Sequence, residues 1–355
     1  MFKRAKAVKP NLRWKTKLSN VENAILPSRT TRPNPLVAGD FVFASLFAPG
    51  SVCAIARESG KLLWMRELDS FASGSVLLHA STLYANSCRT LYALDPTSGR
   101  IRWQFSPKLD PGEWIYSQPV VKSGRLFIGD RCGNLHCLDA RTGKRVWRRQ
   151  TSRGGNNQVN ATALILGDRV ITANNQGAVI CYSAETGKTL WRQKVDAACT
   201  CELLRIRSQV VVAANSLYCI DLQDGVICTE FNFPLKMVRS VAVTGSRIAV
   251  VLGTDFQIQP SAWNNPSAFN GELLILERGR EIARRTLSDT FNIRIDIETG
   301  LIYAVNHSEM RIIDSSDASV LSSQRGEFAL PGVSGGQLYG LSRDGTLFSQ
   351  SVPQI

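Results

Sequence analysis

The sequence predicts an all-β fold, an eight-bladed β-propeller built from four-stranded antiparallel blades. A hairpin unit, LYALDPTSGRIRWQF at residues 91–105, recurs along the chain. The tryptophans that end these units, Trp64, Trp103, Trp147 and Trp191, follow one another at intervals of 39, 44 and 44 residues. Four short strands in a repeat of roughly 40 residues are typical of a propeller blade, which buries its two faces only against neighbouring blades.

Each unit consists of two strands joined by a tight turn. Residues 91–94 alternate in the manner of a half-buried strand. Asp95 begins the turn with a side chain that can accept backbone amides, Pro96 fixes φ, and Gly99 accepts the left-handed conformation. The alternation resumes on the return strand, which carries Ile101 and Trp103.

The copies differ in how well they are preserved. Units at residues 52–64, 135–147 and 179–191 keep a tryptophan four residues after the glycine. Later copies are worn, because Thr229 and Ser322 occupy the tryptophan position. We therefore expect eight blades, or seven if the last worn repeats merge.

The two ends of the chain complement each other. Residues 328–350 contain three strand-like runs without a fourth, and residues 11–18 (NLRWKTKL) read as a fourth strand without a blade. We expect the N-terminal strand to complete the last blade and close the ring. Residues 1–10 are expected to form a basic disordered tail, and residues 11–355 a single domain. The expected blades span residues 36–68, 74–106, 117–150, 161–195, 202–233, 239–287, 291–325, and 328–350 with 11–18.

The pattern A-x-D-x-x-T/S-G-x-x-x-W resembles the PQQ-type repeat of quinoprotein alcohol dehydrogenases and of the outer-membrane assembly lipoprotein BamB. The resemblance is clear over residues 36–225 and faint but continuous to the end. It implies the blade, because the motif describes the turn and the inter-blade tryptophan. It does not imply quinone binding, since fold alone does not carry function.

The resemblance also indicates what a quinoprotein site requires. Such enzymes use a calcium ion held by carboxylate and amide oxygens, a tryptophan beneath the quinone, and usually an adjacent Cys-Cys pair. This sequence has no Cys-Cys pair. We therefore expect no cofactor, with PQQ and calcium as the alternative.

Composition limits the location and the chemistry. No apolar run reaches 18 residues, and the N-terminus lacks both the apolar stretch of a secretory signal and a lipobox-like cysteine. We expect a cytoplasmic protein, or a periplasmic one if a leader was trimmed. Nine cysteines without a C-x-x-C pair agree with a reducing compartment. Whether Cys199 and Cys201 have redox chemistry stays open.

Three cysteines share one position of the repeat. Cys137, Cys181 and Cys219 occupy the place that Ala93 takes in another copy. A small buried residue is expected there, because free cysteine commonly packs as a small hydrophobe.

Long connections mark one face of the predicted ring. In a propeller, the links between blades and the turns between second and third strands open on the same face. The segments 19–35, 106–117, 150–160 and 254–270 all belong to these connections. Function tends to lie on the elaborated loops of a rigid scaffold, so we expect it on this face.

The leading hypothesis is a non-catalytic scaffold that presents this face to a protein partner. Aromatic residues on loops suit an interface, whereas the alternative is that they cap the blades. The candidate partner-binding residues comprise aromatic anchors and polar contacts: Trp114, Tyr116, Phe256, Trp263, Phe269, Asn157, Gln158 and Arg239.

A second hypothesis is an enzyme or small-ligand binder at the mouth of the central channel, using Glu113, Asn156 and Asn160. Ordinary loop capping is the alternative reading of these side chains. The histidines, His79, His136 and His307, are not accompanied by a G-x-S-x-G motif. The sequence therefore favours a protein that is not an enzyme, without excluding one.

A third hypothesis rests on charge. The net charge is +13, and the first 20 residues hold seven basic residues and no acid. Nucleic acid or an anionic surface is therefore a possible partner, through Lys3, Arg4, Lys6 and Lys9. A second cluster of six basic residues lies within residues 141–153. The alternative is that these charges protect a strand edge from aggregation.

Overall fold

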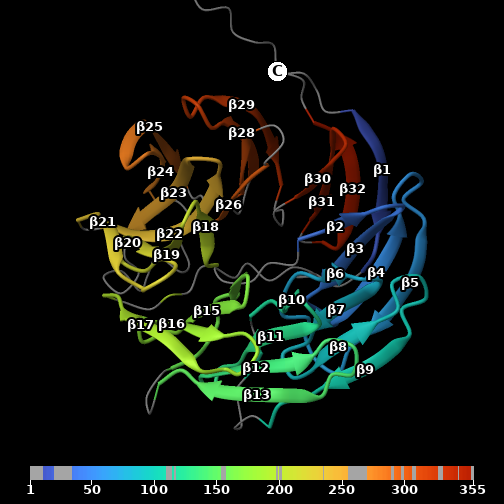
Figure 1. Cartoon of the computed structure of the whole chain (residues 1–355). Coiled ribbons are helices and arrows are strands. Elements are labelled where there is room, and N and C mark those ends of the chain that lie inside the picture. Colours follow the sequence, from blue (N-terminus) through green and yellow to red (C-terminus); the bar gives the residue numbers. More distant parts are fainter. Residues whose placement is uncertain are drawn as a thin grey trace, which may run out of the picture.

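The computed structural model describes residues 11–19, 34–108, 114–115, 117–152, 157–196, 199, 202–234, 236–254, 270–288, 292–296, 300–305, 309–326, 331–342 and 344–352. These residues form eight four-stranded antiparallel sheets arranged as blades around an axis (Figure 1). The prediction of an eight-bladed β-propeller is confirmed, and the seven-bladed alternative is wrong. The described residues contain no helical segment with the length and hydrophobicity needed to cross a bilayer.

The first four blades follow the repeat closely. Blade one consists of β2 (Leu36–Ala38), β3 (Phe41–Leu46), β4 (Ser51–Ala56) and β5 (Leu62–Glu67). Blade two consists of β6 (Leu77–His79), β7 (Thr82–Asn86), β8 (Leu91–Leu94) and β9 (Ile101–Phe105). Blade three consists of β10 (Val120–Lys122), β11 (Arg125–Gly129), β12 (Asn134–Asp139) and β13 (Arg145–Gln150). Blade four consists of β14 (Leu164–Leu166), β15 (Arg169–Ala173), β16 (Ala178–Ser183) and β17 (Thr189–Lys194).

The second half of the ring is less regular. Blade five consists of β18 (Leu204–Ile206), β19 (Gln209–Ala213), β20 (Leu217–Asp221) and β21 (Ile227–Phe231). Blade six consists of longer strands, β22 (Lys236–Thr244), β23 (Arg247–Thr254), β24 (Asn270–Glu277) and β25 (Arg280–Ser288). Blade seven consists of β26 (Asn292–Ile295), β27 (Leu301–Val305), β28 (Glu309–Asp314) and β29 (Val320–Arg325).

Blade eight joins the two ends of the chain. It consists of β30 (Gly332–Ser334), β31 (Gln337–Leu341), β32 (Thr346–Ser351) and β1 (Leu12–Lys17), in the order β1-β32-β31-β30. Trp14 of β1 lies opposite Ser349 of β32, and Lys17 forms an ion pair with Asp344. The predicted closure by the N-terminal strand is confirmed. It ties the first described strand to the last one, so both ends of the domain are fixed.

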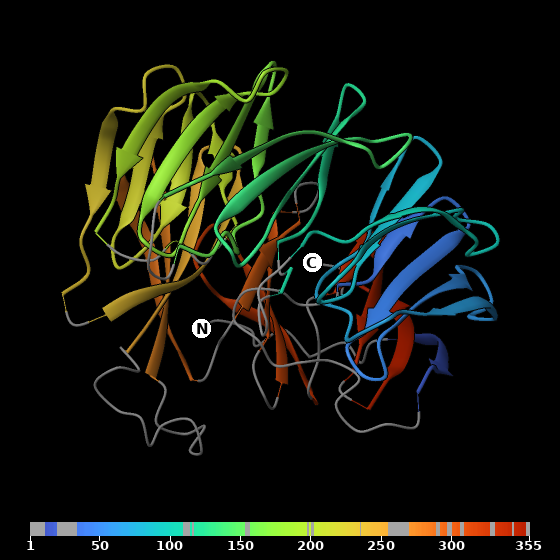
Figure 2. The same ribbon diagram turned by 90° about the horizontal axis from the view of Figure 1, so that it is seen from below.

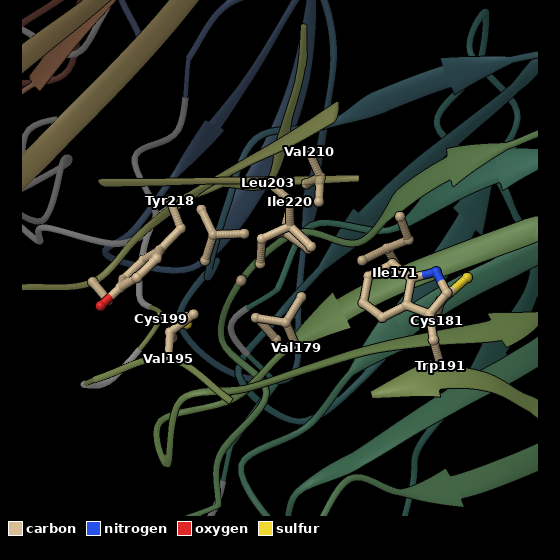
Figure 3. Packing of buried hydrophobic residues seen from close by; sticks show 14 residues of the cluster. Ile171, Val179, Cys181, Trp191, Val195, Cys199, Leu203, Val210, Tyr218 and Ile220 are labelled. Carbon is tan, nitrogen blue, oxygen red and sulfur yellow. The ribbon is translucent and has the colours of Figure 1, made fainter. Parts of the chain in front are cut away.

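The hydrophobic core lies between neighbouring blades. The first strand of each blade is innermost and the fourth is at the rim, as β10 and β13 show in Figure 1. Second and third strands are buried almost continuously, whereas β13 is exposed at four of its six residues. Figure 3 shows one inter-blade cluster, in which Ile171 and Trp191 of blade four pack with Val210 of blade five.

A tryptophan from each well-preserved blade packs on the turn of the next blade. The indole of Trp147 lies against Gly187, and its Nε1 donates to the carbonyl oxygen of Ala184 at 3.1 Å. The other joints of this kind pair Trp14 with Gly60, Trp64 with Gly99, Trp103 with Gly143 and Trp191 with Gly225. A side chain on any of these glycines would collide with the indole ring. Glycine therefore serves two purposes at this position: it adopts the left-handed backbone of the turn, and it leaves room for the tryptophan of the preceding blade.

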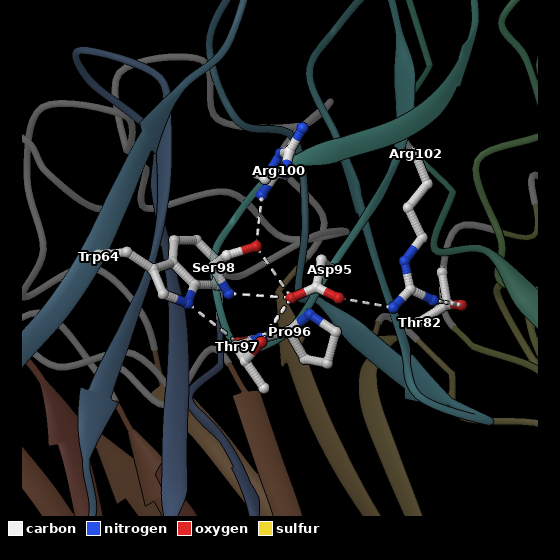
Figure 4. Close-up of polar contacts among 8 residues, drawn as sticks. All are labelled: Trp64, Thr82, Asp95, Pro96, Thr97, Ser98, Arg100 and Arg102. Carbon is white, nitrogen blue, oxygen red and sulfur yellow. Dashed lines mark hydrogen bonds and ion pairs between the residues drawn. The ribbon is translucent and has the colours of Figure 1, made fainter.

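The aspartate of the repeat fixes the turn on which the tryptophan rests. Asp95 Oδ1 accepts the backbone amides of Thr97 and Ser98, both at 3.0 Å, and Oδ2 accepts Arg102 at 2.7 Å (Figure 4). Hydrogen bonds from Thr97, Arg102 and Ser98 hold the pKa of Asp95 below its usual range. Trp64 of the preceding blade donates to the carbonyl of Pro96 at 2.9 Å in the same turn.

The shared cysteine position lies on the third strand of the blade, directly opposite the tryptophan of the fourth strand. Cys137 pairs with Trp147 and Cys181 pairs with Trp191. Both thiols are buried, and burial raises the pKa of Cys137 to about 12 and that of Cys181 to about 11. Cys219 is buried in the same way. These positions are the small buried sites that the repeat predicted.

The worn joints use other contacts. Thr229, Ala283 and Ser322 stand where a tryptophan would be, opposite Cys219, Ile275 and Ile312 respectively. Between blades six and seven, Arg285 donates to the carbonyl of Ala318 at 2.7 Å. A buried aliphatic cluster fills this joint instead of an indole ring.

Replacing Trp147 with alanine should lower the free energy of unfolding by about 3–5 kcal/mol. The indole is buried, and the neighbouring blades cannot move together to fill the cavity that its removal would leave. Val146→Ala is the control, since Val146 is 43% exposed on the same strand. It should cost less than about 1 kcal/mol. Denaturant unfolding measures both. Equal losses would contradict the role assigned to the indole.

Gly143→Ala should destabilise the protein more than Gly124→Ala. Both glycines have positive φ, +71° and +74°, so both variants bear the same backbone penalty, about 1–2 kcal/mol. A Cβ on Gly143 would lie 2.5 Å from the Trp103 ring, whereas nothing lies within 4 Å of one on Gly124. Overpacking should add about 1–3 kcal/mol at Gly143 alone. Thermal unfolding of the pair tests this, and indistinguishable variants would refute it.

Candidate interaction face

The loop face comprises the inter-blade links and the turns between second and third strands. Figure 2 shows the ring turned by 90°, with the blades' strands running between this face and the opposite one. The β11–β12 turn lies between two links, because Arg131 N donates to the carbonyl of Trp114 at 3.0 Å and Val159 N to that of Asp130 at 2.9 Å. This turn and the described parts of its two neighbouring links are therefore joined by backbone hydrogen bonds.

Trp114 lies in the link between blades two and three. Its side chain is half-buried, and the guanidinium carbon of Arg131 lies 5.8 Å from the ring centroid. Ile115, next to it, is completely buried. The link is thus held by a buried aliphatic residue, while Trp114 keeps a partly accessible surface next to a cation.

Asn157 is fixed inside the joint between blades three and four. It is 6% exposed, and its Nδ2 donates to the carbonyl of Ser152 at 2.8 Å. A Cβ on Gly133 would come within 2.3 Å of the Asn157 amide, so the two segments are in tight contact. Asn157 therefore shapes this surface, although little of its own side chain is accessible.

Gln158 is the centre of a carboxamide cluster. Its Oε1 accepts the Nδ2 groups of Asn160 and Asn175, each at 3.2 Å. The Oδ1 atoms of Asn160 and Asn175 are buried and accept no hydrogen bond from the described residues. Asn175 was not singled out from the sequence, although the run Asn-Asn-Gln at 156–158 recurs at 174–176. The cluster is chemically suited to receive a hydrogen-bond donor.

Arg239 lies in β22 and is 7% exposed. A Cβ on Gly253 of the paired strand β23 would lie 1.9 Å from its Nε, so the side chain covers that glycine. The structure thus brings Asn157, Gln158 and Asn160 together in one link and places Arg239 apart from them, in blade six.

An aromatic pair on this face was missed by the sequence reasoning. Phe47, in the β3–β4 turn, stacks on Phe71 of the next link, with ring centroids 4.7 Å apart and planes at 10°. Phe71 is 46% exposed, and neighbouring Pro49 is exposed as well. The available signal was a phenylalanine beside Pro49-Gly50, outside the strand alternation.

Two opposite charges lie on inner segments near the axis. Glu202 precedes β18 of blade five, and Arg294 belongs to β26 of blade seven. Both side chains are exposed to solvent, yet protein atoms surround Glu202 closely enough that desolvation raises its pKa, an effect that the charge of Arg294 opposes. Arg294 also donates to the carbonyl of Pro331 at 3.3 Å.

Several predicted site residues lie outside the described residues: Lys3, Arg4, Lys6, Lys9, Glu113, Tyr116, Asn156, Phe256, Trp263 and Phe269, together with Cys201 and His307. Their roles stay predictions. β23 and β24, which flank residues 255–269, are longer than the equivalent strands of blades one to five.

The described side chains do not gather into a metal centre. No group of three or more histidine, cysteine, aspartate or glutamate side chains gathers among them. His136 is 2% exposed, and its Nε2 lies 2.7 Å from Asp130, which also accepts Asn134 N at 2.8 Å. This buried pair holds the β11–β12 turn. Glu113 and Asn156 of the predicted ligand site lie outside the described residues, so no chemistry is derived through PQQ with calcium.

Comparisons with known proteins agree with the repeat. A family model described as outer membrane protein assembly factor BamB matches residues 4–229. This match ends at Thr229, where the first tryptophan is lost. A search of curated proteins found no match.

Solved structures share the fold at low identity. BamB from Moraxella catarrhalis is 16% identical, with a TM-score of 0.60, over 97% of this chain and 100% of that one. A quinohemoprotein alcohol dehydrogenase from Pseudomonas putida is 11% identical, with a TM-score of 0.76, over 96% and 76%. The computationally designed protein Ika8 is 13% identical, with a TM-score of 0.72, over 93% and 99%. The chain belongs to the family of PQQ-repeat propellers described by the outer membrane protein assembly factor BamB.

Proposed function

We propose that this protein is a non-catalytic scaffold that binds a protein partner through its loop face. Membership of the BamB family supports this reading, since that family is named for an assembly factor. The described residues provide a surface whose loops are held by backbone hydrogen bonds. The proposed partner is defined by its chemistry: it is a protein with an exposed apolar residue that can pack against the aromatic pair of Phe47 and Phe71.

The observation that carries the proposal is the stacked pair of Phe47 and Phe71. Nearly half of the Phe71 surface is exposed, beside exposed Pro49. The loops that carry the pair are held together, because Ala72 N donates to the Phe47 carbonyl at 3.3 Å and Cys88 N to the Phe71 carbonyl at 2.8 Å. Rigid exposed aromatics bind partners at low entropic cost and dominate interface energies.

The other candidate contacts extend the same face. Trp114 is partly accessible beside Arg131, and Gln158 is half-buried in the next link. We retain Trp114, Tyr116, Phe256, Trp263 and Phe269 as proposed anchors. Asn157 and Arg239 are buried, so in this proposal they position the surface more than they touch a partner.

Phe71→Ser should weaken partner binding by roughly 30-fold or more, because it removes an aromatic anchor that contributes about 2 kcal/mol of binding free energy. Leu190→Ser is the matched control, since Leu190 is 43% exposed on the rim strand β17. The control should bind normally. Quantitative binding to the partner purified from the host, with the melting temperature of each variant, tests this. Equal affinity for wild type and Phe71→Ser would refute the proposal.

A second candidate is a small-ligand binder at the loop-face end of the axis. The supporting observation is that no described residue donates a hydrogen bond to the buried Oδ1 atoms of Asn160 and Asn175. A native mass spectrum of gently purified protein separates the two candidates. A small-mass adduct that is lost in Asn160→Ala would favour the ligand, whereas a co-purifying polypeptide that is lost in Phe71→Ser would favour the scaffold.

A further inference from the structure

The rims of the blades differ strongly in charge. In blade three, the outer turn and strand at residues 139–150 contain five basic residues and one acid. The equivalent residues 221–231 of blade five contain three acids and no basic residue. We call the exposed cations of the first rim, Arg141, Lys144, Arg145 and Arg148, the basic edge.

The basic edge is not neutralised by its surroundings. No described acid forms an ion pair with any of its four side chains. The one acid of this rim, Asp139, accepts the backbone amide and the hydroxyl of Thr142, both at 2.8 Å. These hydrogen bonds, together with the charge of Arg141, lower the pKa of Asp139, so it stays ionised within its own turn and offsets one charge of this rim.

Arg149 has a different role from the basic edge. Its Nε donates to the carbonyl of Gly187 at 2.8 Å, and its Nη2 to that of Thr186 at 2.9 Å. Arg149 therefore joins blade three to blade four. The contrast shows that the other arginines of this rim have no such structural partner among the described residues.

The positive surface continues beyond the basic edge on two sides. The β10–β11 turn, with Lys122 and Arg125, is attached to it by the hydrogen bond from Ala140 N to the Gly124 carbonyl at 2.9 Å. On the other side, blade four follows, with Lys188 exposed next to the residues that Arg149 contacts. Two acids lie in the same turns, Asp139, whose Oδ2 is 3.9 Å from Arg125 Nη1, and the exposed Glu185 beside Lys188. The cations outnumber these acids, so their potentials add.

Protection of the strand edge does not account for this distribution. Charged residues of either sign discourage edge-to-edge pairing, and blade five achieves this with acids. Such protection needs no clustering of one sign on neighbouring turns. The accumulation of arginine on one rim points to an anionic partner, since the planar guanidinium matches phosphate bidentately.

We infer that the basic edge binds the phosphate backbone of a nucleic acid, independently of sequence. A β-strand advances about 3.3 Å per residue, close to the roughly 3.4 Å rise per phosphate along one DNA strand. Arg145 and Arg148 pair with Leu138 and His136, which are two residues apart on β12, so they lie on one face of the sheet about two such steps apart and can contact separate phosphates. A lipid surface fits less well, because Val146 is the large exposed apolar residue of β13 and no exposed aromatic accompanies it.

The test compares two triple variants of the full chain. R141Q/R145Q/R148Q removes three charges of the basic edge. K61Q/R100Q/R280Q removes the same net charge from exposed positions of blades one, two and six. Fluorescence anisotropy with a labelled mixed-sequence duplex DNA measures affinity at several salt concentrations. Each lost phosphate contact reduces the slope of log K against log salt by about 1, so the first variant should lose about 3 and the second almost nothing.

Each other outcome overturns the inference. Equal losses in the two variants would mean that net charge alone drives binding. Absence of DNA binding by the wild type at low salt would remove the nucleic acid as partner. Binding to phosphatidylserine vesicles that depends on the three arginines, without DNA binding, would assign the edge to an anionic membrane. Unchanged melting temperatures confirm that both variants are folded. The inference does not depend on the loop face.

Discussion

The packing of an indole ring on the glycine of the neighbouring blade is the interaction on which the structure depends. A single blade has two apolar faces and cannot bury them alone, so its stability comes from the joints. Each indole fills the joint and donates to a backbone carbonyl of the turn that it covers, as Trp147 does to Ala184. The turn presents that carbonyl because an aspartate such as Asp95 holds its amides. One short motif therefore specifies both the hairpin and its neighbour.

The ring divides into two parts by how its joints are made. Five joints, from Trp14 on Gly60 to Trp191 on Gly225, use the indole. The joints after blades five, six and seven have Thr229, Ala283 and Ser322 at that position. The family match covers the first part and ends at residue 229. Blade six, in the second part, has longer strands, including β23 and β24, and a buried aliphatic cluster fills its joint with blade seven.

Rigid joints also explain why surface features can serve as sites. Phe47 and Phe71 come from different connections, and backbone hydrogen bonds hold these loops together. The basic edge lies on a different part of the molecule, the rim of blade three, where four of the six residues of the fourth strand are exposed. The pair Phe47 and Phe71 and the basic edge take no part in the indole joints that close the ring, so each surface can be changed without altering those joints.

The sequence by itself determined the fold and its closure. The spacing of Trp64, Trp103 and Trp147 and the lone strand near Trp14 report local patterns, which the chain carries in its residue order. Tertiary structure decided which candidate residues are accessible. Asn157 and Arg239 read as polar contacts, yet Gly133 and Gly253 bring neighbouring backbone against them. The sequence pattern does not single out Phe71, because its contact with Phe47 forms only when the two loops come together in the fold. Accessibility depends on contacts between distant segments, which the pattern of a single repeat does not encode.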